Sequence, residues 1–191
     1  MTIPLIALDM DGVVNSTKLI RTWIESKYEE LSHIEDPIKR RVKAREEYLK
    51  AFADGYEAIF PELAERVTRI CNNTGAYILW SSTWRNSRVY SEIETAKDMF
   101  NRRGLLGDRL IGYSPDFGGD KYRCSRGLEI SYWLTNRTWN EGKDVRCAVI
   151  DDRLDAGAEL PEYAKLFVTD EYVGITDNMV EEVIDFLNKA D

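Results

Sequence analysis

Two aspartates, separated by one residue and followed at once by a glycine, lie near the start of the chain. Asp9 and Asp11 come directly after the apolar run at 3–8, which is typical of a buried strand. Residues i and i+2 of a strand point the same way, so both carboxylates can lie at one site, where their mutual repulsion favours a divalent cation. Gly12 allows the chain to turn sharply away. The pattern indicates metal-assisted carboxylate chemistry.

Polar residues also follow two apolar runs later in the chain, and an arginine begins a predicted helix between them. Because the carboxyl ends of parallel strands meet along one edge of a sheet, we expect all of these groups to converge on the two aspartates. Together they supply hydroxyls, a cation and a second pair of carboxylates. These residues are Ser81, Ser82, Thr83, Arg126, Asp151 and Asp152.

This combination of groups is what phosphoryl transfer through an aspartyl-phosphate requires. A phosphomonoester repels an attacking carboxylate, so Mg²⁺ and an arginine must neutralise its charge. A carboxylate nucleophile splits hydrolysis into two easier steps, and a neighbouring carboxyl can protonate the leaving oxygen and later deprotonate water. Mg²⁺ prefers oxygen ligands, which carboxylates and phosphate both provide.

The elements that must position these groups alternate between strand and helix along the chain. Such alternation predicts an α/β fold with a central parallel sheet covered on both faces, a three-layer sandwich. The predicted strands are 3–8, 76–80, 110–112, 145–150 and 166–168, with a loop at 114–125. The predicted helices run from 37 to about 54, from 61 to about 73, from about 86 to 103, from about 125 to 139 and from 177 to 189.

The polar stretch 16–56 interrupts this alternation after the first strand. Leu19, Ile20, Trp23 and Ile24 recur in it at helical spacing. We therefore expect a helical cap over residues 16–56 that hangs over the carboxyl ends of the strands as a lid, with a catalytic core formed by 1–15 and 57–191. The basic run Lys39–Arg45 is either a solvated helix face or an electrostatic funnel for a phosphorylated substrate.

Composition limits the possible partners. The net charge of −8 over 191 residues argues mildly against tight, nonspecific binding to long nucleic acid. The single histidine, His33, lies in the predicted cap, which nearly excludes a histidine nucleophile or a zinc site. No apolar run is long enough to cross a membrane, so we expect a cytoplasmic protein with no membrane contact.

Two of the motifs resemble those of a known superfamily. Leu5–Val14 resembles motif I of the haloacid dehalogenase (HAD) superfamily, and Ala148–Arg153 resembles its motif IV. The wider succession resembles the HAD domain associated with Swiss Army knife RNA-repair proteins. Similarity to the phosphatase half of bacteriophage polynucleotide kinase-phosphatase is looser. The further segments that carry the resemblance are Trp80–Arg85, Gly112–Pro115, Arg126–Ile130, Val168–Asp170 and Gly174–Thr176.

The resemblance implies a HAD-like Rossmannoid fold and a role for each matching residue. Asp9 would be the nucleophile and Asp11 the general acid/base, and both would contact Mg²⁺, Asp11 through its main-chain carbonyl. Asp152 would be the direct metal ligand of the acid pair, with Asp151 bound directly or through water. Asp155 is a weaker candidate just outside the direct ligands.

The phosphate would be held by motif II and motif III. Motif II offers two adjacent serines, of which Ser82 is preferred and Ser81 is the alternative. Arg126 fits motif III better than Lys121 does, because Gly-x-Glu-Ile follows it, and Glu129 is expected to be a local partner for an arginine. Gly12 and Arg85 are further candidates, and Trp84 would either stack on a base or pack against the cap.

The expected function is that of a phosphomonoesterase acting on nucleotides, as a 5′- or 3′-nucleotidase. One alternative is a nucleic-acid end-processing 3′- or 5′-phosphatase in repair, with the basic run Lys39–Arg45 docking the strand. An alternative of another class is a regulatory protein that binds a phosphorylated ligand with little turnover.

Overall fold

The structure is a computed structural model that describes residues 2–52, 59–86, 90–117, 124–136 and 143–189. A five-stranded, all-parallel sheet forms its centre, in the order β3-β2-β1-β4-β5, which confirms the predicted α/β class. The strands are β1 (Ile3–Leu8), β2 (Tyr77–Trp80), β3 (Leu110–Tyr113), β4 (Val145–Asp151) and β5 (Ala164–Val168). The α-helices are α1 (Thr17–Glu30), α2 (Pro37–Phe52), α3 (Pro61–Thr74), α4 (Ile93–Arg102), α5 (Arg126–Asn136) and α6 (Asp177–Asn188).

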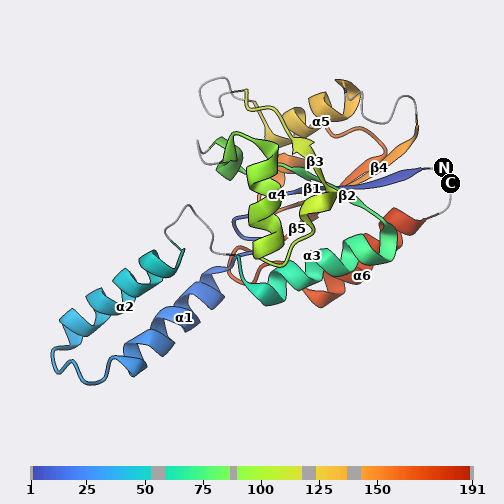
Figure 1. Ribbon diagram of the computed structural model, residues 1–191. Coiled ribbons are helices and arrows are strands. Elements are labelled where there is room, and N and C mark those ends of the chain that lie inside the picture. Colours follow the sequence, from blue (N-terminus) through green and yellow to red (C-terminus); the bar gives the residue numbers. More distant parts are fainter. Residues whose placement is uncertain (1, 53–58, 87–89, 118–123, 137–142, 190–191) are drawn as a thin grey trace.

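The two faces of the sheet bury separate sets of side chains, because successive residues of a strand point to opposite faces. Ile6 and Leu8 of β1 join a large core with residues of α3, α4 and α6. Leu5 and Ala7 join a smaller core with residues of α5. Figure 1 shows α3 and α6 below the sheet and α5 above it, so the three layers follow directly from the alternation.

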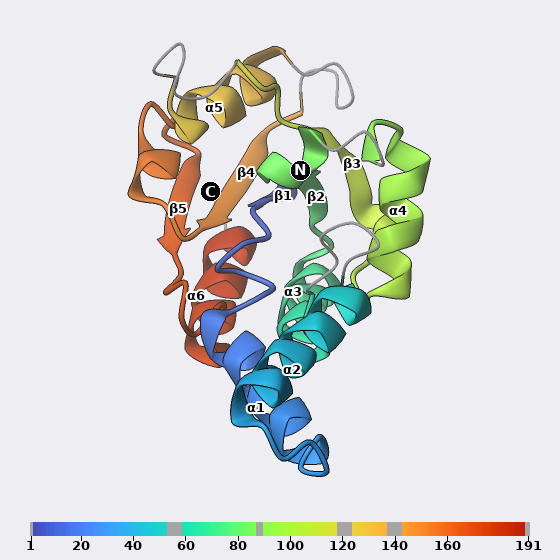
Figure 2. The ribbon, with the colours of Figure 1, turned by 90° about the vertical axis from the view of Figure 1, so that its left-hand side faces the viewer.

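Helices α1 and α2 lie against each other as a hairpin, and neither covers the sheet (Figures 1 and 2). Trp23 of α1 meets Tyr48 of α2 edge to face, with ring centroids 5.7 Å apart. Ser16 caps α1 by accepting a hydrogen bond from the Leu19 N–H at 3.2 Å. The hairpin reaches outward from the carboxyl edge of the sheet rather than lying flat across it. Its division from the core as a separate cap stays a prediction.

One predicted helix begins later than expected. The helix predicted from about residue 86 is instead a single 3-10 turn, Thr83–Asn86, followed after residues 87–89 by α4 from Ile93. Between the two elements, the buried ring of Tyr90 packs against that of Trp80, with ring centroids 5.6 Å apart. The ends predicted for two other helices, near 54 and 139, lie outside the described residues, as does most of the loop predicted at 114–125.

Among the described residues, none of the helices combines the length and the apolar character that crossing a membrane would need.

Candidate active site

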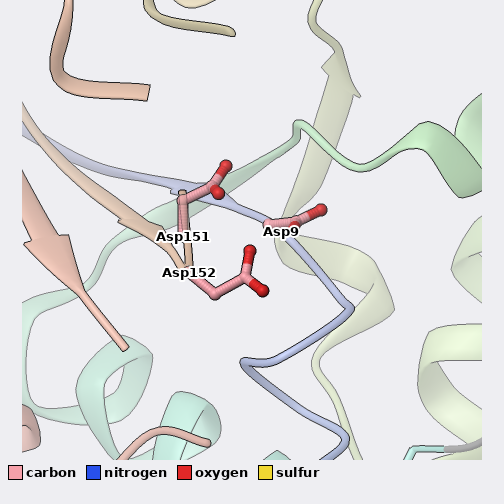
Figure 3. Close-up of side chains that lie close together, drawn as sticks. All are labelled: Asp9, Asp151 and Asp152. Carbon is pink, nitrogen blue, oxygen red and sulfur yellow. The ribbon is translucent and has the colours of Figure 1, made fainter. Parts of the chain in front are cut away.

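Three aspartates gather where β1 and β4 end side by side. Leu8 pairs with Ile150 in the parallel register, and the Asp9 N–H donates to the Ile150 carbonyl at 3.0 Å. Asp9, Asp151 and Asp152 therefore come together, and one oxygen of each lies within 4.8 Å of the others (Figure 3). The convergence predicted from the sequence is present for these three.

Strand alternation directs Asp9 and Asp151 toward α5. Ala7 and Val149 lie in the core beneath α5, and the side chains two residues further along point the same way. The arginine at the start of α5, Arg126, therefore faces both carboxylates, and its charge offsets part of the rise that burial causes in the pKa of each.

Burial dominates the electrostatics of this cluster. Asp9 is 4% exposed and Asp151 is fully buried, and desolvation raises the pKa of Asp9 to about 6 and that of Asp151 to about 7. Repulsion from Asp9 adds to the rise at Asp151. Burial also raises the pKa of Asp152, with further repulsion from Glu171 and Asp11. The buried carboxylates therefore retain protons more readily than exposed ones do, unless a cation compensates their charge.

The unsatisfied oxygens of the cluster fit a hard cation. Oδ1 of Asp9 and Oδ2 of Asp151 are buried and have no hydrogen-bond partner among the described residues. A buried carboxylate oxygen without a partner is costly unless a cation or a water completes it. Three carboxylates within 4.8 Å form an all-oxygen donor set, which is the chemistry that Mg²⁺ selects.

Arg126 is anchored through its main chain, and its side chain keeps one hydrogen-bond donor without a partner among the described residues. Its main-chain N–H donates to Asp155 at 3.3 Å, and its side chain is only 5% exposed. Nη1 of the guanidinium has no hydrogen-bond partner among the described residues. The start of α5 lies close to the segment after β4, since a Cβ on Gly127 would come 1.9 Å from the Ala158 carbonyl oxygen. A buried cation with an open donor facing carboxylates is suited to binding an anionic group.

The two serines after β2 face different partners. Ser82 hydrogen-bonds the Asp9 carboxylate, which partly offsets the rise that burial causes in the pKa of Asp9. The Ser81 hydroxyl instead lies 3.4 Å from that of Ser114, in a buried pair. Thr83 is exposed in the 3-10 turn. The phosphate-binding role of either serine stays a prediction, and the geometry favours Ser82.

Arg85 is turned inward, where it holds the backbone of this loop. Its Nη1 donates to the carbonyl oxygens of Ser81 at 3.0 Å and Ser82 at 2.7 Å. Its Nη2 donates to the Pro115 carbonyl at 3.0 Å and to Glu129 at 2.7 Å. Glu129 is thus an arginine partner, as the sequence predicted, but its hydrogen-bonded partner is Arg85, 44 residues away, while the local Arg126 lies 4.0 Å from it. These four acceptors account for both terminal nitrogens of Arg85, which supports a positioning role and leaves its predicted phosphate contact untested.

Asp11 is held by two donors that sequence reasoning missed. The Asn15 amide donates to Oδ1 of Asp11 at 2.9 Å, and the Trp84 indole N–H donates to Oδ2 at 2.9 Å. Trp84 is only 7% exposed, so its ring has little free face on which a base could stack. Asn15 could have been noticed because it lies four residues after Asp11, whereas the Trp84 contact spans 73 residues and leaves no local signal.

Gly12 is required by the turn that follows Asp11. Its φ is +68°, which disfavours any side chain, and a Cβ there would lie 2.6 Å from Oδ2 of Asp152. Its N–H donates to Oδ1 of Asn15 at 2.9 Å. The glycine therefore brings the Asp11 turn against the metal-ligand candidate Asp152.

Other predicted residues lie apart from the cluster. The Asp155 carboxylate is engaged by Arg153, at 2.9 and 3.0 Å, and by the Arg126 N–H, so it anchors α5 rather than standing beside a metal. Lys121 lies outside the described residues. In the basic run, the Arg40 guanidinium is taken by the Ile34 carbonyl and Lys43 by Glu47, as a solvated helix face would be.

Comparison with known proteins identifies the family to which the chain belongs. No curated protein matches the chain, and no solved structure does. One family model matches residues 5–180, and its description is the HAD domain in Swiss Army Knife RNA repair proteins. The matched residues include both edge strands of the sheet, β3 and β5, and the ends of β1 and β4 that carry the carboxylate cluster. The chain therefore belongs to this HAD family.

Proposed function

We propose that this protein is a Mg²⁺-dependent phosphomonoesterase that works through an aspartyl-phosphate on Asp9. Membership of the HAD family supports a phosphatase. The observation that carries the mechanism is the buried cluster of Asp9, Asp151 and Asp152, which faces an arginine with an open donor. Carboxylates and a cation around one point are what transfer of a phosphoryl group needs.

In the first step, an oxygen of Asp9 attacks phosphorus and the bond from phosphorus to the ester oxygen breaks. Asp11 gives its proton to that oxygen, which leaves as an alcohol, and Asp9 holds the phosphoryl group. Ser82 and Arg126 would contact the phosphoryl oxygens. In the second step, Asp11 takes a proton from water, the water oxygen attacks phosphorus, and the bond to Asp9 breaks to release inorganic phosphate.

The metal would be held by Asp9, Asp151 and Asp152 together with the Asp11 main-chain carbonyl. When bound, it neutralises carboxylate and phosphate charge so that one anion can approach another. The unsatisfied oxygens of Asp9 and Asp151 support this assignment.

The preferred substrate is a small nucleotide, with the hairpin of α1 and α2 acting as a cap at the entrance. Burial and the Asp11 charge together raise the pKa of Tyr48 on α2, which puts this ring within electrostatic reach of the catalytic turn. A cap near the entrance favours a compact substrate, and the net charge of −8 disfavours a long polyanion.

A second candidate function is the removal of a terminal phosphate from a nucleic acid. The family description, which names RNA repair proteins, favours it. Lys39, Arg41 and Arg45 of α2 have exposed side chains that could contact backbone phosphates.

The test is release of phosphate with Mg²⁺ and with EDTA, over nucleoside 5′- and 3′-monophosphates, sugar phosphates and oligonucleotides with a 3′- or 5′-terminal phosphate. Asp9→Asn is the control. We expect metal-dependent release that disappears in the variant. Mononucleotides as best substrates would support the nucleotidase, whereas terminal phosphates hydrolysed with a steep salt dependence would support end processing. A stable stoichiometric complex without product would overturn both and favour the regulatory alternative.

A further inference from the structure

We propose that Trp84 and Asn15 are positioning residues that aim the Asp11 carboxylate at the leaving oxygen of the substrate. The inference rests on the proposed function, because it needs Asp11 to exchange a proton. Asp11 is an exposed residue on the turn after β1, where a short acidic side chain would otherwise sample several rotamers. Two donors instead engage it, one on each oxygen, each at 2.9 Å.

Neither donor can reverse its role. An indole nitrogen donates and never accepts, so Trp84 can hold Asp11 only in this sense. The Asn15 amide could be turned over in principle, but its Oδ1 accepts the Gly12 N–H at 2.9 Å, which orients its NH₂ toward Asp11. The Asp11 carboxylate is therefore held in the one orientation in which both of its oxygens accept a hydrogen bond.

The two donors come from opposite sides of the site. Asn15 belongs to the same turn as Asp11 and is itself 7% exposed. Trp84 lies on the 3-10 turn after β2, where its main-chain N–H approaches the Ser82 hydroxyl at 3.4 Å. The ring therefore ties Asp11 to the loop whose Ser82 hydrogen-bonds Asp9. The clamp thus couples the position of the acid to the position of the nucleophile.

Loss of the two hydrogen bonds to Asp11 should slow the reaction of some substrates more than that of others. Attack by Asp9 does not use the Asp11 proton, whereas departure of the ester oxygen does. A loosened Asp11 should therefore slow reactions in which the leaving oxygen is strongly basic, as in alkyl and nucleoside phosphates. It should matter much less for a nitrophenyl phosphate, because a nitrophenolate leaves without receiving a proton. A merely structural defect in the fold would lower both rates alike.

Trp84→Phe tests this directly, because it keeps an aromatic side chain and removes the N–H. With a nucleoside monophosphate we expect kcat/KM to fall about tenfold or more, and with 4-nitrophenyl phosphate by no more than about threefold. The comparison uses kcat/KM because this ratio reports the steps up to departure of the leaving group, whereas the second step, in which Asp11 activates water, is the same for both substrates. Asn15→Leu should show the same selectivity. Trp133→Phe is the matched control, since that indole lies beside Gly112 on β3 and should leave both rates unchanged.

Equal losses of kcat/KM on both substrates, or no loss on either, would overturn the proposal. A readout without turnover covers the case in which a variant folds poorly. This readout compares the NMR spectra of the ¹⁵N-labelled wild-type protein and its Asp11→Asn variant. The Trp84 indole N–H signal should differ between the two far more than the other four indole signals do. An unchanged Trp84 signal would also overturn the proposal. A wild-type protein that hydrolyses no phosphomonoester would instead contradict the proposed function, and the indole result would stand apart from that failure.

Discussion

Arg85 donates to Glu129 across 2.7 Å inside the protein, with both side chains almost fully buried. Arg85 also donates to the carbonyl oxygens of Ser81, Ser82 and Pro115, and Glu129 lies 4.0 Å from Nε of Arg126. This ion pair therefore links the backbone of the motif II loop to the arginine that faces the carboxylate cluster.

Breaking this pair from one side should be costly, because it leaves a buried charge without its partner. We expect Arg85→Met or Glu129→Gln to lower the free energy of unfolding by about 3–5 kcal/mol, and the double variant to cost less than the sum of the two. Urea unfolding of all four proteins measures the coupling.

The exposed pair Arg102–Asp98, at 3.1 Å, is the control for this cycle. It should show a coupling of no more than about 1 kcal/mol, because both partners are solvated. Coupling energies of similar size for the two pairs would contradict the argument from burial.

The metal-free protein should lose stability as the pH rises from acid to neutral. The folded pKa values of Asp9 and Asp151, about 6 and about 7, lie above the ordinary aspartate value of 3.8, so the folded state binds more protons than the unfolded state across that interval. The free energy of unfolding then falls as the pH rises. The fall begins near the ordinary aspartate pKa of 3.8 and ends above the two folded pKa values.

Added Mg²⁺ should reverse this trend, because it replaces the protons that the cluster gives up. Thermal unfolding with and without Mg²⁺ should show a larger rise in Tm at about pH 8 than at about pH 5. Asp151→Asn should flatten the metal-free slope. A Mg²⁺ effect that does not depend on pH would count against metal binding at this cluster.

Ser82→Ala should reduce catalysis more than Ser81→Ala does, because only the Ser82 hydroxyl is bonded to Asp9. Loss of one hydrogen bond to a charged group corresponds to roughly a tenfold fall in kcat/KM. Steady-state kinetics on the best substrate measure kcat/KM for both variants. A larger effect at Ser81 would assign the phosphate contact to the other serine.

Gly12→Ala should abolish activity while leaving most of the fold intact. An alanine would need a positive φ, and its Cβ would strike Asp152, so the turn that carries Asp11 would have to shift. We expect a loss in the free energy of unfolding of about 1–3 kcal/mol and at least a hundredfold loss of turnover. Gly75→Ala is the control, since its φ is also positive, at +72°, and nothing lies within 4 Å of its Cβ position. That variant should carry the backbone strain alone and keep its activity.

The sequence by itself determined the sheet and the meeting of Asp9, Asp151 and Asp152. Apolar runs define strands, and parallel crossovers bring the carboxyl ends of those strands to one edge. These are local and near-universal constraints, so they could be read without coordinates. The predicted start of the helix near residue 86 was wrong, because α4 begins at Ile93, after the buried contact between Tyr90 and Trp80.

Only the tertiary structure decided what each side chain beyond the strand ends does. Ser81 and Ser82 are neighbours of the same type, and the loop conformation alone turns one to Ser114 and the other to Asp9. Arg85 faces inward because Glu129, 44 residues later, is buried beside it. The Trp84–Asp11 hydrogen bond joins residues 73 apart, and such contacts depend on how the loops pack rather than on any periodicity in the sequence.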